Sequence, residues 1–182
     1  MLVTWASGGA PEGDPSHHPA PVPAVHAHWP LGRPDLIVPM PAAHVIAAGT
    51  SQETVDMDLA TNLTSPTWIK AADLLPGAPD VVRRATIGLV GGPVLAVWEP
   101  GDETCAAPSG TAFLAPAGAM LHLQIFYKKS WQADQQEKSD RSSVGLYFTS
   151  APASGTGIDA VVVDGPKEAS DGPFTFTSSA NP

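Results

Sequence analysis

Residues 120–128 read MLHLQIFYK, a stretch in which more apolar and more polar side chains alternate. Successive residues of a β-strand point to opposite faces of a sheet. The apolar face of the expected strand carries Leu121, Leu123, Ile125 and Tyr127, and the more polar face carries Met120, His122, Gln124 and Phe126. We therefore expect a strand with its apolar face in a core. His122 lies on the other face, where a lone histidine usually has a structural role.

Seven further short segments before and after this strand also have strand-like sequences and are bounded by Gly, Pro, Ser or Asp. In chain order they read HVIAAG, ETVDMDL, TWIKAADL, DVVRRATIGLV, VLAVW, TAFLA and SSVGLYFT. No convincing long amphipathic helix lies between them, which favours strands joined by turns. The sequence therefore predicts an all-β fold, an antiparallel β-sandwich of jelly-roll type. Only residues 130–141, SWQADQQEKSDR, depart from this pattern, as one helical turn or a mobile loop.

The predicted sandwich domain covers residues 42–149 and has an extended Pro/Gly-rich arm on each side. Nine prolines between Pro11 and Pro41 exclude a helix, so residues 1–41 are expected to form an extended arm or a strap over a surface. Residues 150–182 form the second arm. It contains two possible edge strands, at residues 159–163 and 173–177.

The charge of the chain excludes some classes of partner. It has 9 Lys and Arg against 18 Asp and Glu, with a formal net charge of −9. Nucleic acids and anionic lipid surfaces both require a basic face, so neither is an expected partner. No segment reaches the roughly 18 apolar residues of a membrane span. The N-terminus lacks the basic and apolar regions of a signal peptide, so the sequence leaves cytoplasmic location or export by another route open.

The side chains that could carry chemistry give weak signals. The stretch HHPAPVPAVHAH brings His17, His18, His26 and His28 into a proline-rich arm, which is poor at holding metal ligands rigidly. The single cysteine, Cys105, is expected on a turn as an inert thiol, because nothing basic nearby would lower its pKa. Two acidic clusters are interpreted as solvated loop charge, with weak cation binding as the alternative: Glu99, Asp102, Glu103 and Asp134, Glu137, Asp140.

Several stretches in order give a resemblance to a known family. WASGGAPEGDP, HWPLGRPDLIVPMP, GAPDVVRRATIGL and LAVWEPGDETCAAPSGTAFLAPAGAMLHLQIFYKKS…SDRSSVGLYF together resemble the N-terminal domain of copper type II, ascorbate-dependent monooxygenases. This is the class of peptidylglycine α-hydroxylating monooxygenase, and the likeness is closest to its cytochrome-fused bacterial relatives. It covers about Trp5 to Phe148. The resemblance implies a jelly-roll sandwich and, for the family, hydroxylation of C–H bonds with O₂, two copper ions and ascorbate.

The resemblance also places the family's first copper site. There, two adjacent histidines after a VV-like pair and a third histidine in an LQ.HY strand hold the ion, and the matching residues are Arg83, Arg84 and Phe126. Arginine stays protonated and phenylalanine has no donor atom, so these positions count as lost ligands. The second copper domain and the C-x-x-C-H haem motif of the bacterial relatives are not recognisable in this sequence. We expect no catalytic residue, metal or cofactor.

These observations predict a non-catalytic structural or accessory subunit that binds other protein subunits through its arms. By analogy with the bacterial relatives, the expected partner is a cytochrome-bearing, membrane-anchored electron-transfer complex, met on its periplasmic side. The alternative is a copper-binding protein or monooxygenase with a rearranged site that uses His17, His18, His26, His28 or His122.

The two adjacent arginines raise a question of their own. If residues 79–90 form a regular strand, one arginine faces solvent and the other faces whatever the strand packs against. An unpaired guanidinium would be costly there. We therefore expect at least one of Arg83 and Arg84 to pair with a carboxylate, of this chain or of a partner.

Overall fold

A computed structural model describes residue 8 and residues 28–104, 106–153, 155 and 157–158. The interpretations that concern His17, His18, His26 and Cys105 lie outside these residues, as do those for the two strand candidates of the C-terminal arm. Among the described residues, no helix has the length and apolar character that a membrane span requires.

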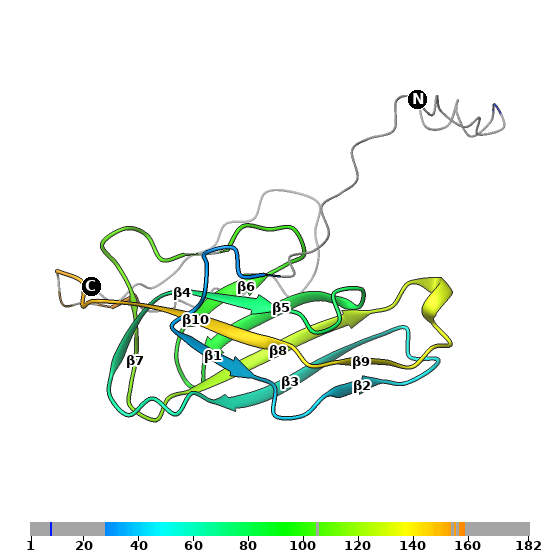
Figure 1. The fold of residues 1–182 in the computed structure, drawn as a ribbon, viewed down its shortest axis with the longest axis horizontal. Helices are drawn as coiled ribbons and strands as arrows, with labels where there is room; N and C mark the ends of the chain where they lie inside the picture. Colours follow the sequence, from blue (N-terminus) through cyan, green and yellow to red (C-terminus); the bar gives the residue numbers. More distant parts are fainter. Residues whose placement is uncertain (1–7, 9–27, 105, 154, 156, 159–182) are drawn as a thin grey trace, which may run out of the picture.

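The described part is an antiparallel β-sandwich, so the predicted all-β fold is confirmed (Figure 1). One sheet has the strand order β1-β10-β4-β7 and the other has β3-β8-β5-β6. Their strands are β1 (Leu36–Pro39), β3 (Gln52–Ala60), β4 (Thr67–Leu75), β5 (Val82–Leu89), β6 (Val94–Trp98), β7 (Phe113–Ala115), β8 (Met120–Lys128) and β10 (Ser143–Thr149). All eight segments predicted as strands are strands here or in the small third sheet. The chain crosses repeatedly between the sheets, as in a jelly roll.

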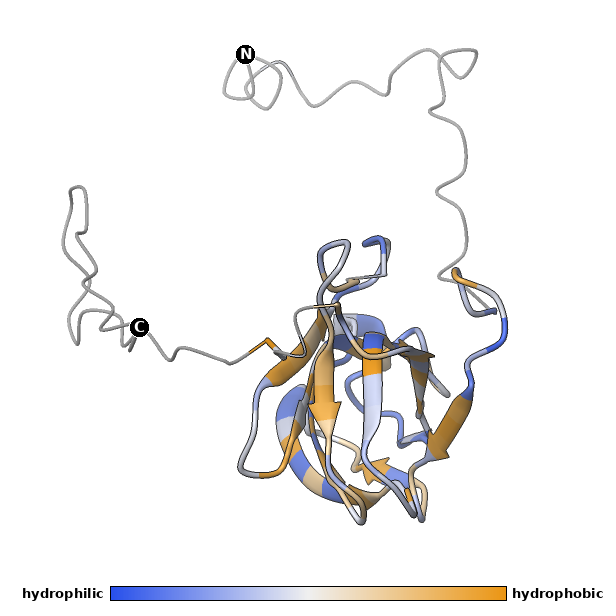
Figure 2. Cartoon of the chain, turned by 90° about the vertical axis from the view of Figure 1, so that its left-hand side faces the viewer, coloured by the Kyte–Doolittle hydropathy of each residue, from blue (hydrophilic) through white to orange (hydrophobic). Residues whose placement is uncertain are grey.

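The core lies between the two large sheets, and the stretch MLHLQIFYK contributes as its alternation predicts. Leu121, Leu123, Ile125 and Tyr127 of β8 are all 0% exposed, whereas His122 on the opposite face is exposed. Val144 and Leu146 of β10 belong to the same buried cluster. Seen along the strands in Figure 2, hydrophobic residues are spread along both layers, as expected for sheets that each bury one face.

A third, two-stranded sheet closes one end of the sandwich. β2 (His44–Ile46) pairs with β9 (Lys138–Asp140), and β9 belongs to the segment predicted as a helical turn or a mobile loop. A single 3₁₀ turn, Trp131–Ala133, also lies in this segment. The buried ammonium of Lys129 donates to three backbone carbonyls, those of Ala47, Asp134 and Gln136, at 2.6, 3.2 and 2.8 Å. The segment is therefore tied to the sandwich at both ends.

Asp140 was interpreted as solvated loop charge, and this interpretation is wrong. Its side chain is 0% exposed. One carboxylate oxygen accepts from the backbone N–H of Ala78 at 2.7 Å. The other accepts from the hydroxyls of Tyr127 and Ser142, at 2.9 and 2.7 Å. Three donors compensate a buried charge that would be costly alone, and they join β8, β9 and the loop before β5 at one point.

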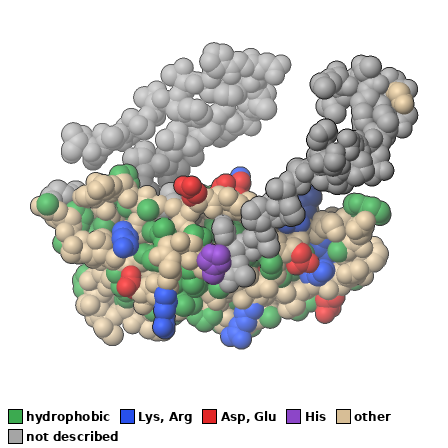
Figure 3. All heavy atoms as spheres, turned by 45° about the horizontal axis from the view of Figure 1, so that its top comes forward, with side chains coloured by type: hydrophobic (Ala, Val, Ile, Leu, Met, Phe, Trp, Pro, Cys, Tyr) green, Lys and Arg blue, Asp and Glu red, His purple; other side chains and the backbone are tan. Residues whose placement is uncertain are grey.

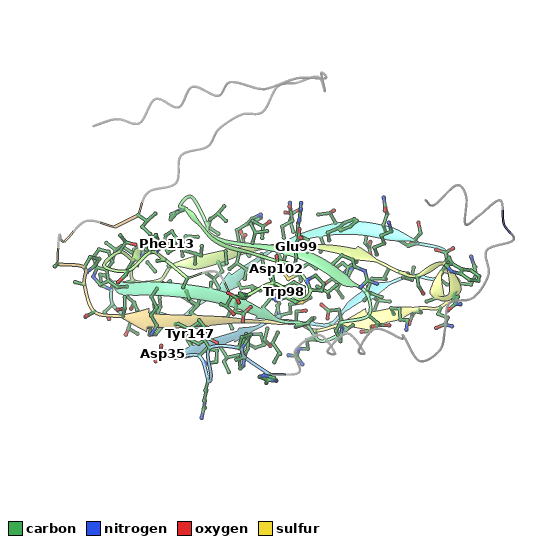
Figure 4. All side chains as sticks on the ribbon, turned by 90° about the horizontal axis from the view of Figure 1, so that it is seen from above. Asp35, Trp98, Glu99, Asp102, Phe113 and Tyr147 are labelled. Carbon is green, nitrogen blue, oxygen red and sulfur yellow. The ribbon has the colours of Figure 1, made fainter. Side chains whose placement is uncertain are left out.

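The described end of the predicted N-terminal arm is part of the sandwich. β1 pairs with β10, and residues 29–35 cross that strand as a strap. The hydroxyl of Tyr147 donates to the carbonyl of Gly32, and the backbone N–H of Phe148 donates to the Asp35 carboxylate; Figure 4 shows Tyr147 and Asp35 together. Trp29 and Pro34 lie directly over Gly145, where a Cβ would meet them at 2.8 and 2.6 Å. Residues 28–41 are therefore fastened to the sheet.

The buried Asp140 cluster predicts a large cost for losing one hydroxyl. Tyr127→Phe keeps the ring but leaves Asp140 with one donor fewer, and we expect a loss of about 1.5–3 kcal/mol in the free energy of unfolding, the range for hydrogen bonds to charged groups. Tyr147→Phe is the matched control, because its hydroxyl donates to a neutral carbonyl. Urea denaturation compares the two. A loss for Tyr127→Phe no larger than that of the control would contradict the role given to Asp140.

The close approach of the strap predicts that Gly145 accepts no side chain. Gly145→Ala forces Trp29 and Pro34 away from β10, and we expect a destabilisation of about 1–3 kcal/mol, as for other overpacked sites. The same change made in a Trp29→Ala background should cost less, because one of the two obstructing side chains is gone. Thermal unfolding of the four proteins measures this coupling. Equal costs in both backgrounds would show that the strap does not press on Gly145.

Candidate functional site

The outer face of the β3-β8-β5-β6 sheet holds the polar side chains that the sequence singled out. Because β-strands alternate, the residues of β8 that leave the core reach this face, and the neighbouring strands add their own outward residues. Cα pairing sets Arg84 opposite Phe126, Thr86 opposite Gln124 and Asp58 opposite His122. Acidic and basic side chains are dispersed over the face drawn in Figure 3.

A β-bulge determines where the two arginines point. The pairing of β5 with β8 shifts register between Val82 and Arg84, so that Arg83 is the extra residue. Val82 and Ala85 on either side are both buried, while Arg83 is partly exposed and Arg84 is exposed. The expectation that one arginine faces the packed side of the strand is wrong, because the bulge breaks the two-residue period. Both guanidinium groups lie on the outer face.

The bulge brings together the three positions that the resemblance assigns to copper ligands. Arg83, Arg84 and Phe126 line one shallow hollow of about 510 Å³, with Thr54, Gln124 and Glu99 completing its rim. Arg83 and Arg84 are consecutive residues of β5, whereas Phe126 comes from the neighbouring strand β8, far later in the sequence. Their side chains do not fit a copper ion, since none of the three offers a lone pair to a metal.

The predicted ion pair is present. Arg84 donates to one carboxylate oxygen of Glu99 through Nε at 2.8 Å and through its terminal nitrogen at 2.7 Å. Glu99 follows Trp98 at the end of β6, and Figure 4 labels both together with Asp102, whose backbone N–H donates to the carbonyl of Glu99 at 3.2 Å. Arg83 donates instead to the backbone carbonyl of Asp80 at 2.8 Å. The hollow therefore contains one guanidinium neutralised by a carboxylate and a second one held by a neutral group.

This hollow can attract an anion or a carboxylate. Among its lining residues, the Glu99 carboxylate is the group that could accept a proton, and one of its oxygens already accepts two hydrogen bonds from Arg84. Guanidinium groups remain protonated, and Gln124, Thr54 and Phe126 do not titrate in that range. The Arg84–Glu99 pair is 60% and 43% exposed, so it contributes little to stability. The hollow therefore offers two guanidinium groups and one carboxylate for contacts with a charged group.

Next to the hollow, His122 is held between two carboxylates. Its Nδ1 lies 2.9 Å from Asp58 and its Nε2 lies 3.2 Å from Asp56, while Gln124 donates to the same Asp56 oxygen at 2.8 Å. Two acidic partners on opposite sides of the ring favour the imidazolium. The hydrogen bond to Asp58 raises the pKa of His122 above 6.5, against a smaller opposing effect of burial.

This arrangement is not a metal site. The two ring nitrogens of His122 point in opposite directions, so one ion could not contact the ring and both carboxylates. No three His, Cys, Asp or Glu side chains within the described ranges are placed to hold a metal ion. His44 stacks on Tyr127, with 5.3 Å between the ring centroids, and its Nε2 forms a hydrogen bond with Glu53 at 2.9 Å. Of the four histidines in the N-terminal arm, His28 is the one that the structure describes.

Sequence reasoning placed His122 on the outer face but missed its two partners. The signal was the alternation in ETVDMDL, which puts Asp56 and Asp58 on one face of a strand. What the sequence could not supply was the register between β3 and β8, which sets Asp58 opposite His122.

Comparisons with known proteins add no family to this description. No protein-family model matches the chain, and neither a curated protein nor a solved structure shows significant similarity to it.

The position of His122 predicts how its charge depends on pH. Asp58→Asn removes the principal cause of the raised pKa and should move that pKa back toward 6.5, and Asp56→Asn should do so less. In the unmutated protein, the stabilisation from this group is full below pH 6.5 and is lost as the pH rises through the raised pKa. NMR titration of the imidazole measures the shift. Asp102→Asn, in an exposed loop, serves as the control, and an unchanged pKa in Asp58→Asn would contradict the assignment.

Proposed function

We propose that this chain is a non-catalytic accessory subunit, whose sandwich is derived from a copper-monooxygenase-like domain and now serves to bind other proteins. One observation carries the proposal: the three positions matched to copper ligands lie in one hollow and are occupied by Arg83, Arg84 and Phe126. Their convergence on one spot is what a former metal site requires. Their side chains exclude the metal there, so the fold remains without the chemistry.

The replacement of histidines by arginines has a physical rationale. A copper ion bound by neutral imidazoles places positive charge on this face, and a guanidinium can supply part of that charge. Glu99 is then the carboxylate that balances it, through its bond to Arg84. Within the described ranges, Arg83 donates to the carbonyl of Asp80 and to no carboxylate, so it can also contact an acidic group of a partner.

The partner we propose is a cytochrome-bearing, membrane-anchored electron-transfer complex on its periplasmic side. This part rests on the resemblance alone, in whose bacterial members the corresponding domain is joined to a cytochrome. Neither His122 nor His44 favours a copper protein with a rearranged histidine site, because His122 is engaged by two carboxylates and His44 by Glu53 and Tyr127.

A copper titration tests this proposal. We expect the unmodified chain to bind no stoichiometric copper, whereas Arg83→His, Arg84→His and Phe126→His together should create a site for about one ion, because imidazole is a good copper ligand. Isothermal titration calorimetry and electron paramagnetic resonance measure the binding. The control carries Arg83→His and Arg84→His alone and should bind more weakly, since it supplies two ligands.

Two results would contradict the proposal. If the triple variant folds but gains no copper affinity over its control, the three positions are not a converted metal site. If the unmodified chain binds copper tightly, and His26→Ala with His28→Ala abolishes this binding, the chain is a copper protein. The accessory role itself is tested by sizing the native complex, where the chain should migrate with a larger assembly rather than as a monomer.

A further inference from the structure

β3 leaves a long backbone edge open at the side of the sandwich. It is the first strand in the order β3-β8-β5-β6, so only one of its edges is paired. It spans Gln52–Ala60, and its register with β8 runs without interruption over all nine residues. Figure 1 shows it along the lower side of the molecule, close to β1.

The register identifies which backbone groups face away from β8. At the two ends of the ladder, the N–H of Lys129 donates to the carbonyl of Ser51 and the N–H of Thr61 donates to the carbonyl of Ala119. Odd-numbered residues of β3 therefore bond to β8, and even-numbered ones point to the open edge. The N–H of Val90 donates to Met120, so the even residues of β8 bond to β5, as the same parity requires.

The N–H and C=O groups of Thr54, Asp56, Asp58 and Ala60 thus form a free edge. None of them has a hydrogen-bond partner in the part of the chain that the structure describes. At the far end of this edge lies a groove of about 450 Å³ between β3 and β1. Its lining includes all four residues of β1 together with Leu59 and Met120. Unpaired strand groups beside an apolar groove are the features that accept an added strand.

Native proteins usually protect such an edge, and β3 lacks most of the usual devices. The other edge strands are shorter: β1 has four residues and ends in Pro39, β7 has three, and β6 has five and meets a bulge. β3 has nine residues and contains no proline, lysine or bulge. Its exposed charges are acidic, those of Asp56 and Asp58, which repel acidic strands and attract basic ones.

We propose that this edge binds an extended segment of another protein in which basic residues alternate with apolar ones. The segment pairs antiparallel with β3 at residues 54–60. Its residues opposite Asp56 and Asp58 share their outer face and are Lys or Arg, because directly opposed unlike charges stabilise a sheet. Its intervening residues lie beside the half-buried Val55 and Met57 and are apolar. This inference rests on the accessory function proposed above and specifies the chemistry of one partner.

Asp56 and Asp58 can each accept a further hydrogen bond from a basic side chain of the added strand. The bonds to His122 and Gln124 use Oδ1 of Asp56 and Oδ1 of Asp58. Oδ2 of each carboxylate has no partner among the described residues. A carboxylate can accept several hydrogen bonds, so each can add a lysine or arginine without losing its present contact.

Charge argues against two other partners for the β3 edge, namely a second copy of the chain and the chain's own terminal segments. Pairing of two β3 strands would set the aspartates of one copy beside those of the other, which is destabilising. The chain's own ends are also unsuitable: residues 1–27 contain no Lys or Arg, and residues 150–182 contain one lysine, Lys167, among four acidic residues. Neither of these two segments supplies the complementary basic strand, so we assign it to another protein.

Synthetic peptides test this with the full chain. The probe is acetyl-Lys-Val-Lys-Val-Lys-Val-Lys-amide, and the charge-reversed Glu/Val peptide is its control. We expect the Lys/Val peptide to bind saturably with a Kd below about 1 mM and more weakly at high salt. The Glu/Val peptide should not bind. N-methylation of the lysine amides, which face β3, should abolish binding, while N-methylation of the valine amides should leave it. Hydrogen exchange should show new protection at the amides of Thr54, Asp56, Asp58 and Ala60.

Variants of the chain locate the contact. Asp56→Asn and Asp58→Asn should each weaken binding roughly two- to fivefold, and Asp102→Asn should not. Thr54→Pro removes one edge N–H without touching the ladder to β8 and should weaken binding, while Thr54→Ala should not.

Three results would overturn the inference: equal binding of both peptides, equal effects of the two N-methylation patterns, or no saturable binding. Self-association that Thr54→Pro abolishes would also overturn it in favour of a second copy. The accessory function fails on different evidence, namely copper binding by the unmodified chain or migration as a monomer, so the two outcomes can be told apart.

Discussion

The two-residue period of β8 is the constraint on which the rest of the structure depends. β8 is an inner strand of its sheet, so its odd residues bond to β3 and its even residues bond to β5. The same period sends Leu121, Leu123 and Ile125 into the core and His122 to the outer face. One strand therefore fixes the position of the core, the register of both neighbours and the face on which the polar groups gather. A slip of one residue would reverse all of these together.

The bulge in β5 shows how a single departure from this period creates a site. Without it, Arg83 and Arg84 would point to opposite faces, and one guanidinium would have to be neutralised inside the sandwich at a large desolvation cost. The extra residue lets both arginines share the outer face while Val82 and Ala85 stay buried. The alternation of the flanking residues predicted the strand. The bulge could not be predicted from it, because VVRRAT fits a regular strand and a bulged one equally well, and only the pairing with Phe126 decides between them.

The parts that sequence reasoning missed depend on contacts between distant residues. The strands and the faces of β8 follow from local alternation, and so does the prediction that an arginine needs a carboxylate. β9 has no apolar pattern and forms because β2 offers it a partner. The burial of Asp140 likewise depends on Tyr127 and Ala78, which are 13 and 62 residues away in the chain, as well as on the nearby Ser142. A charged residue in a polar segment looks solvated until the donors that surround it are known.

The outer face and the open edge of β3 are linked, because Asp56 and Asp58 belong to both. Their carboxylates hold His122 on the outer face and give the edge its sign of charge. When His122 is protonated it neutralises part of that charge, and when it loses its proton the edge becomes more acidic. While both carboxylates are ionised, the edge disfavours pairing with a second copy and with other acidic strands whether or not His122 is protonated, since the aspartates outnumber the single histidine. The charges that orient His122 thus also protect the longest edge strand of the sandwich from self-association, while a strand of opposite charge is still accepted.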